Sequence, residues 1–74
     1  MLNKIRDIII EVTGKKIAGA DTDFVSDLGF NSFDVVNIVG AFEDEFGITI
    51  PTRDIRQFRR VSDVLDYLDN LGIK

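Results

Sequence analysis

Cysteine, histidine and tryptophan are absent from this 74-residue chain, and proline occurs once. Without cysteine the chain cannot form a disulfide framework or a thiolate metal site, which argues against a stapled secreted scaffold. Without histidine or cysteine the usual pairs of nucleophile and general base cannot be assembled. The sequence therefore predicts a protein that is not an enzyme and that holds no metal.

A long apolar run is also absent. The most apolar segment, MLNKIRDIIIEVTG at the start, is interrupted by Lys4, Arg6, Asp7 and Glu11. This pattern is typical of an amphipathic helix and excludes a transmembrane span or a signal peptide. We therefore expect a cytoplasmic protein that does not insert into membranes.

The length allows one small domain, residues 1–74, near the lower limit of what a single hydrophobic core can stabilise. The initial methionine and the lack of linkers favour a free-standing protein, and an excised domain would look similar. Neither an internal repeat nor a low-complexity tract interrupts the chain.

Basic residues are missing from the middle of the sequence. Between Ile17 and Thr52 there are seven acidic residues and no lysine or arginine, and the net charge is −4. Such a block would repel a phosphate backbone, which argues against nucleic acid as a partner. It favours partners with basic docking surfaces, although acidity that serves solubility alone is an equally simple explanation.

Apolar residues recur at helical spacing in three segments, each followed by a glycine that is a plausible C-cap: Gly14, Gly47 and Gly72. A further one or two helical turns are expected from Thr52 to Phe58. The apolar positions that define the three segments are Leu2, Ile5, Ile8, Ile9 and Val12; Phe33, Val36, Val39, Phe42 and Phe46; and Val61, Val64, Leu65, Leu68 and Leu71.

Two connections complete the predicted fold. Residues 15–31 show no periodicity and form a long loop, which we expect to be anchored by Phe24, Val25, Leu28 and Phe30. Residues 47–51, GITIP, form an extended connector without a partner strand. The predicted fold class is all-α: a small bundle of three main helices plus one short helix, with a long loop between the first two.

The stretch DLGFNSFDVV, residues 27–36, places two good helix caps side by side. If Asn31 is the N-cap, Asp34 occupies the third helical position and Ser32 the first, with its hydroxyl free. A phosphate ester on that hydroxyl would be stabilised by the free amides and the positive end of the helix. Alternatively, Ser32 is the cap and Asn31 an ordinary loop residue. Capping chemistry alone leaves both interpretations open.

At these residues the sequence resembles the acyl carrier proteins. The likeness covers DLGFNSFDVVNIVGAFEDEFGITIP, FVSDLG before it and VSDVLDYL near the end. In this family a serine at the start of the second helix carries 4′-phosphopantetheine, derived from coenzyme A, whose thiol holds acyl groups as thioesters. The resemblance implies an acyl-carrier-like fold, attachment of the arm at Ser32, supporting roles for Gly29 and Asn31, and a function in fatty-acid synthesis or a related acyl pathway.

The resemblance also implies a monomer that meets several partners. These are a phosphopantetheinyl transferase, acyltransferases, ketosynthases and other acyl-pathway enzymes with basic docking patches. The residues that match the docking positions of the family are Asp34, Glu43, Asp44 and Glu45.

Two departures from the family pattern concern charge. Asn31 stands where many carriers have aspartate, and TRDIRQFRR is basic where the third helix of a typical fatty-acid carrier is acidic. Arg53, Arg56 and Arg60 recur at helical spacing. One interpretation is that Arg53 and Arg56 bind partner enzymes of a specialised pathway. The other is that the arginines pair with the acidic helix or are merely solvated.

The sequence bears on three alternatives to a fatty-acid carrier. A carrier of polyketide, aminoacyl or D-alanyl cargo and a carrier-like interaction module that never takes the arm both stay open. A calcium loop in DTDFVSDLGFNS is excluded, because its sixth position is Ser26 where glycine is required and its twelfth is Ser32 where glutamate is required.

Overall fold

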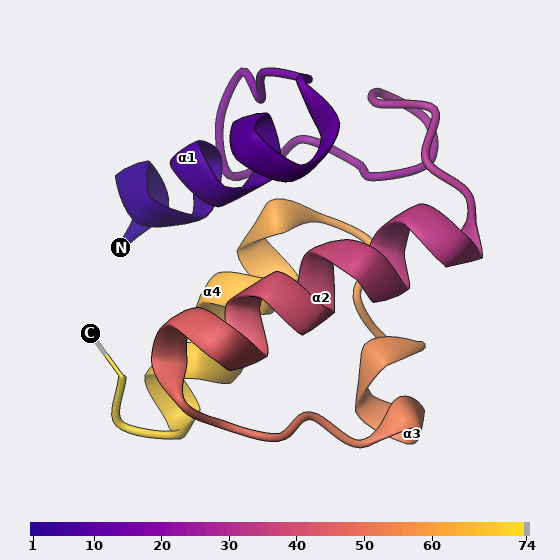
Figure 1. The fold of residues 1–74 in the computed structure, drawn as a ribbon. Coiled ribbons are helices and arrows are strands. Elements are labelled where there is room, and N and C mark those ends of the chain that lie inside the picture. Colours follow the sequence, from indigo (N-terminus) through magenta and orange to yellow (C-terminus); the bar gives the residue numbers. More distant parts are fainter. Residues whose placement is uncertain (74) are drawn as a thin grey trace.

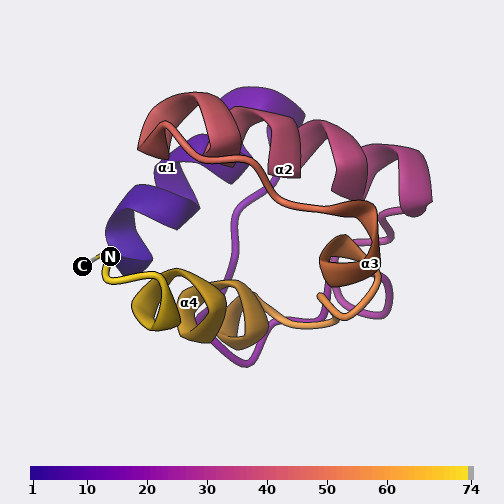
Figure 2. The same ribbon diagram turned by 90° about the horizontal axis from the view of Figure 1, so that it is seen from below.

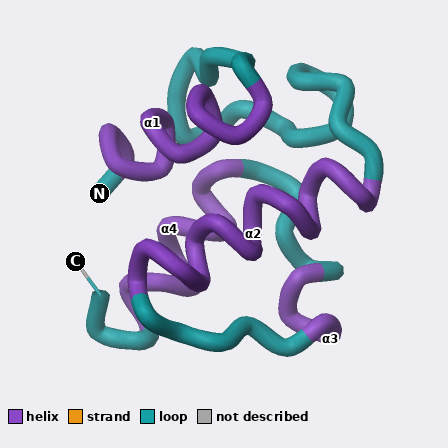
Figure 3. The backbone as a smooth tube through the Cα atoms, in the orientation of Figure 1, coloured by secondary structure: helices purple, strands orange, loops and turns teal. Residues whose placement is uncertain are grey.

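The computed structural model describes residues 1–73. Over this range the chain is helical without β-strands, apart from a single bridge that pairs Asp23 with Arg60 (Figure 3). The predicted all-α class, with three main helices, one short helix and a long first loop, is confirmed. The helices are α1 (Leu2–Thr13), α2 (Ser32–Phe46), α3 (Thr52–Ile55) and α4 (Val61–Asn70).

Helix α2 runs across the middle of the fold and packs against α1 (Figure 1). Seen from below, α1 and α2 lie on one side of the molecule and α4 on the opposite side (Figure 2). Both views place α3 beside the half of α2 in which that helix begins. The start of α2 therefore lies at one end of the bundle, with the long loop leading to it and α3 next to it.

The three main helices each bury one face in a common core. Ile5 and Ile9 of α1, Phe42 of α2, and Val61 and Leu68 of α4 are fully buried. Glycines end two of these helices as predicted, since Gly14 (φ 74°) and Gly47 (φ 65°) adopt the left-handed conformation.

Several residues that the periodicity assigned to the core are instead exposed. In α2 the buried face is formed by Ile38, Val39 and Phe42, whereas Phe33 is 71% and Val36 is 52% exposed. The helix is apolar on more than one face, so spacing alone selected the wrong stripe at its start. The assignments of Val12, Val25 and Leu71 to the interior are wrong for a related reason: each lies at an end of a helix or in a loop, where the core no longer reaches.

The long loop is fastened to the beginning of α4. The N–H of Phe24 donates to the carbonyl of Arg59 (2.9 Å), and the N–H of Val61 donates to the carbonyl of Thr22 (3.0 Å). Phe24, Leu28 and Phe30 are buried as predicted. The loop is therefore part of the packed structure, and its last residues enter α2 at a fixed position.

Helix α3 is short but firmly attached. Its helical residues end at Ile55, earlier than the limit of Phe58 allowed by the sequence, although Phe58 is buried as expected. Tyr67 of α4 donates a hydrogen bond from its hydroxyl to Asp54 (2.8 Å) and packs edge-on against Phe58, with ring centroids 5.3 Å apart. The bond to Asp54, and secondarily burial, raise the pKa of Tyr67 above its ordinary value of 10.0.

Candidate functional site

The N-cap of α2 is Asn31. Its side-chain oxygen accepts a hydrogen bond from the N–H of Asp34 (2.9 Å), and the carboxylate of Asp34 accepts one from the N–H of Asn31 (3.2 Å). This reciprocal pair is a complete capping box. The interpretation in which Ser32 caps the helix is therefore wrong, and Ser32 is the first helical residue.

Ser32 is exposed, and its hydroxyl makes no hydrogen bond within residues 1–73. In the same range no acceptor takes up the N–H groups of Ser32 and Phe33, which are among the first amides of α2. Free amides and the helix dipole both stabilise an anion at this position. A phosphodiester on the Ser32 oxygen fits the residues present, because it would meet unpaired donors and displace no existing bond.

The loop that leads into α2 turns at Gly29, which adopts φ +70°. A Cβ at this position would meet only the Lys15 amine, at 4.0 Å, so the glycine is needed for its backbone conformation and not for space. The turn is held by a hydrogen bond from the N–H of Gly29 to the carbonyl of Val25 (3.0 Å). The Lys15 ammonium donates to the carbonyl of Leu28 (2.8 Å) and fixes the same turn from the end of α1.

Asp23 organises the rest of the loop, a role that the sequence analysis did not assign. One carboxylate oxygen accepts from the N–H groups of Val25 and Ser26, both at 2.9 Å. The other accepts from Nε of Arg59, also at 2.9 Å. The bond from the Ser26 amide, then the Arg59 guanidinium and the Val25 amide, lower the pKa of Asp23 below its ordinary value of 3.8, against the opposing effect of burial.

We predict that Asp23 makes the stability of the protein depend on acid pH. Because its pKa is lower in the folded protein than in the unfolded chain, its stabilising contribution is complete above the ordinary value of 3.8. The contribution is lost as the pH falls through the folded pKa. Urea unfolding of the wild type and of Asp23→Asn should differ at neutral pH and converge at strongly acid pH. A difference between the two proteins that stays constant with pH would contradict the assignment.

Two apolar side chains stand beside Ser32 and were not predicted as functional. Phe33 follows it directly, and Val36 lies three residues further along α2, so that the two are neighbours on the helix surface. Exposed apolar neighbours of this kind are typical of a surface that another protein covers. Their position next to Ser32 in the sequence could have indicated a role at the site. Helical spacing instead assigned them to the core.

The four acidic residues predicted to meet partners all lie on α2, and three of them have contacts within the protein. Asp34 closes the capping box, Glu43 accepts a hydrogen bond from the N–H of Ile50 (2.8 Å), and Glu45 lies 3.4 Å from the ammonium of Lys4. Asp44 is exposed, and no ion pair is described for it within residues 1–73. The structure thus spreads these carboxylates along α2, from its first turn to its last.

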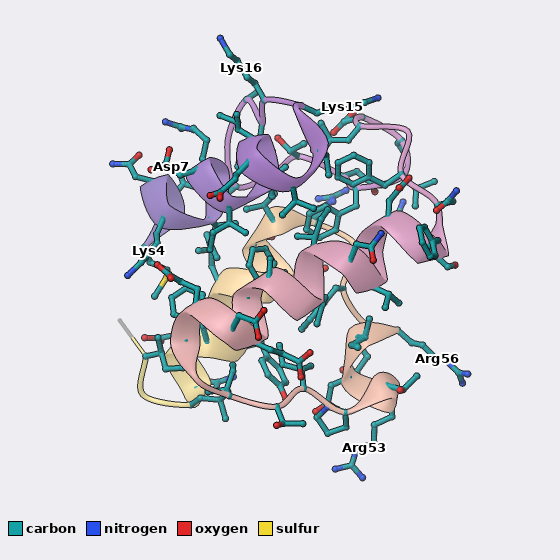
Figure 4. All side chains as sticks on the ribbon, in the orientation of Figure 1. Lys4, Asp7, Lys15, Lys16, Arg53 and Arg56 are labelled. Atoms are coloured by element: carbon teal, nitrogen blue, oxygen red, sulfur yellow. The ribbon has the colours of Figure 1, made fainter. Side chains whose placement is uncertain are left out.

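Arg53 lies on α3 and Arg56 is the C-cap of that helix, and both side chains point away from the body of the protein (Figure 4). Arg60 does not share their face, because the helix has ended before it and it is the N-cap of α4. Within residues 1–73, the ion pairs of the arginines join Arg53 to Asp54 (3.5 Å) and Arg59 to Asp23, and none joins an arginine to α2.

Residues 1–73 contain no group of three or more histidine, cysteine, aspartate or glutamate side chains that could hold a metal ion. The helices formed by those residues are all too short or too polar to span a bilayer.

Comparison with known proteins places this geometry in a family. The profile of the family described as "Phosphopantetheine attachment site" matches residues 3–68. The acyl carrier protein of Bdellovibrio bacteriovorus is 40% identical over 72 residues, which cover 93% of this chain and 91% of the relative. Two solved structures have the same fold. A provisionally assigned acyl carrier protein from Mycobacterium tuberculosis is 28% identical, with a TM-score of 0.84 over 93% of this chain and 95% of that chain.

The second solved structure is the acyl carrier protein of Thermotoga maritima, which is 34% identical, with a TM-score of 0.80 over 92% of this chain and 81% of that chain. The family profile, the Bdellovibrio relative and the two solved structures all indicate the same family. The free serine at the start of α2 is consistent with that family. The chain therefore belongs to the acyl carrier protein family, whose cofactor is 4′-phosphopantetheine.

Proposed function

We propose that Ser32 carries the 4′-phosphopantetheine arm and that the protein presents acyl groups on it to the enzymes of fatty-acid synthesis or a related acyl pathway. The observation that supports this most directly is the capping box of Asn31 and Asp34, which leaves the Ser32 hydroxyl exposed and without a structural role. When bound, the arm supplies a terminal thiol that holds acyl groups as thioesters.

The residues of the chain have the roles of anchor and docking surface. Ser32 Oγ is the nucleophile on which a phosphopantetheinyl transferase acts, while Asn31 and Gly29 hold it at the helix start. The amides of Ser32 and Phe33 stabilise the phosphodiester charge. Since the chain contains no histidine and no cysteine, we infer a carrier and not a catalyst.

Partner enzymes in this proposal are the transferase, acyltransferases and ketosynthases. They approach α2, where Asp34, Glu43, Asp44 and Glu45 supply negative charge and Phe33 supplies apolar surface. The same proposal includes a monomeric state. It also includes a cytoplasmic location, because coenzyme A and its thioesters are intracellular metabolites. A carrier of polyketide, aminoacyl or D-alanyl cargo is the second candidate. The positive charge of Arg53 on α3 and of Arg56 at its C-cap favours this second candidate.

The decisive experiment is intact-protein mass spectrometry after incubation with coenzyme A, magnesium and a broad-specificity phosphopantetheinyl transferase. We expect the wild type to gain the mass of one phosphopantetheine unit and Ser32→Ala to gain none. Ser26→Ala is the control, because it removes an exposed hydroxyl from the loop before α2 and should be modified like the wild type. A folded wild type that gains no mass would contradict the proposal and favour an interaction module that never takes the arm.

A further inference from the structure

The face of α2 that carries Ser32 is the face next to α3. At 100° per residue, Ser32, Val36 and Glu43 fall within about 40° of one another around the helix. The carboxylate of Glu43 accepts a hydrogen bond from the N–H of Ile50, and Ile50 lies in the segment that leads directly into α3. In Figures 1 and 2, α3 lies beside the first half of α2. An enzyme that reaches an arm on Ser32 and covers Val36 would therefore also meet α3.

The charge that such an enzyme meets there is positive. Arg53 and Arg56 are one helical turn apart, and both extend into solvent (Figure 4). We call these two residues the α3 arginine face. The side chain of Arg53 is 84% exposed and forms an ion pair with its sequence neighbour Asp54 at 3.5 Å, while no ion pair is described for Arg56 within residues 1–73.

The negative charge near Ser32 is largely engaged within the protein. Asp34 is the acidic residue of the first turn of α2, and its carboxylate accepts the N–H of Asn31. Glu43, Asp44 and Glu45 lie in the last turn of α2, at the other end of the helix from Ser32. The α3 arginine face therefore adds two exposed positive charges on this side of the molecule, and within residues 1–73 neither is paired with a carboxylate of α2.

The segment that carries these two charges is tethered to α4. Asp54 is bonded to the Tyr67 hydroxyl, and Phe58 is buried against the Tyr67 ring. Arginines held on a fixed backbone lose less conformational freedom on binding than arginines on a mobile loop, and a guanidinium can bind a carboxylate through two parallel hydrogen bonds.

We propose that the partner enzymes of this carrier present aspartate or glutamate side chains to the α3 arginine face, next to the apolar contact of Phe33 and Val36. The proposal rests on the proposed function, because it concerns enzymes that act on the arm at Ser32. The docking surface then carries both signs of charge. It is acidic toward the end of α2 and basic beside the attachment site. Enzymes whose docking surface is basic throughout are then disfavoured by like-charge repulsion at α3.

The test measures acyl transfer to a reference enzyme of known charge, a bacterial fatty-acid ketosynthase with a basic docking patch. The carriers are loaded to completion from an acyl-coenzyme A by the broad-specificity transferase. Transfer breaks the thioester on the arm and forms a thioester on the ketosynthase cysteine, which mass spectrometry of the ketosynthase follows. The variants are Arg53→Glu/Arg56→Glu, Arg53→Gln/Arg56→Gln and Lys16→Glu. Lys16 is an exposed cation at the opposite end of the molecule (Figure 4), and Lys16→Glu lowers the net charge by two, as Arg53→Gln/Arg56→Gln does, so it controls for net charge in that variant.

We expect the double glutamate variant to transfer about tenfold faster than the wild type, the double glutamine variant to be intermediate, and Lys16→Glu to stay within about twofold of the wild type. A ketosynthase whose basic patch is reversed to glutamate should invert this order. The proposal is overturned if the double variants transfer no faster than the wild type, or if Lys16→Glu accelerates transfer equally. Failure of the proposed function is distinguishable, since no variant would then take the arm in the loading step.

Discussion

Replacing Phe42 by alanine is expected to lower the free energy of unfolding by about 4 kcal/mol. Phe42 is fully buried near the middle of α2, where α1 and α4 also contribute fully buried residues. The substitution removes a large apolar side chain and leaves a cavity that the surrounding helices cannot fully close. For a chain of this length the whole stability is roughly 4–11 kcal/mol, so a large part of it depends on this ring.

Urea unfolding followed by circular dichroism measures this effect. The matched control is Phe33→Ala, which makes the same chemical change in the same helix at a side chain that is 71% exposed. It should alter stability by no more than about 0.5 kcal/mol. Similar losses for the two variants would mean that the buried face of α2 is assigned incorrectly.

The ends of the helices were predictable because local chemistry determines them. Gly14 and Gly47 end α1 and α2 in the left-handed conformation that glycine adopts without strain. Pro51 disfavours helix at Ile50 and is compatible with the helix that begins at Thr52. Each of these glycine and proline residues lies within a few residues of the helix end that it determines.

The buried face of α2 was predictable only in part, because the helix is apolar on several sides. Val39 and Phe42 were assigned to the core correctly, but Ile38 was missed and Phe33 and Val36 were included. Which stripe is buried depends on where α1 and α4 lie, and no periodicity within α2 contains that information.

The role of Asp23 was not predictable from local pattern. It is one of several acids in the loop, and its partner Arg59 lies 36 residues further along the chain. A charge pair of this range exists only after the loop has been fastened to the start of α4.

The free hydroxyl of Ser32 was not predictable from capping chemistry alone, and the assignment of the arm to Ser32 comes from the family pattern. Asn31 and Ser32 are both good caps, so the choice between them depends on whether Asp34 completes a box with Asn31. The structure contains that box, and it frees the serine that the resemblance had assigned to the arm. The docking residues stay predictions, because a single chain shows which side chains are exposed and not which of them a partner covers.

Replacing Phe33 by alanine is expected to reduce kcat/KM for transfer of the arm to Ser32 by about 30-fold, which corresponds to about 2 kcal/mol. The side chain follows Ser32 directly, is 71% exposed, and has Val36 as its neighbour on the helix surface. A transferase that brings coenzyme A to Ser32 cannot avoid this ring, and an aromatic side chain buried at the centre of an interface carries a large share of binding energy.

The measurement is the rate of mass gain at several carrier concentrations, with Leu71→Ala as the control. Leu71 is another exposed apolar residue, but it follows the last turn of α4, far along the chain from Ser32, so its removal should leave kcat/KM unchanged. Because Phe33 contributes little to folding, a loss of rate in Phe33→Ala without a loss of stability can come only from docking. Equal rates for the wild type and Phe33→Ala would show that the transferase recognises the backbone and charges around Ser32 and leaves the ring in solvent.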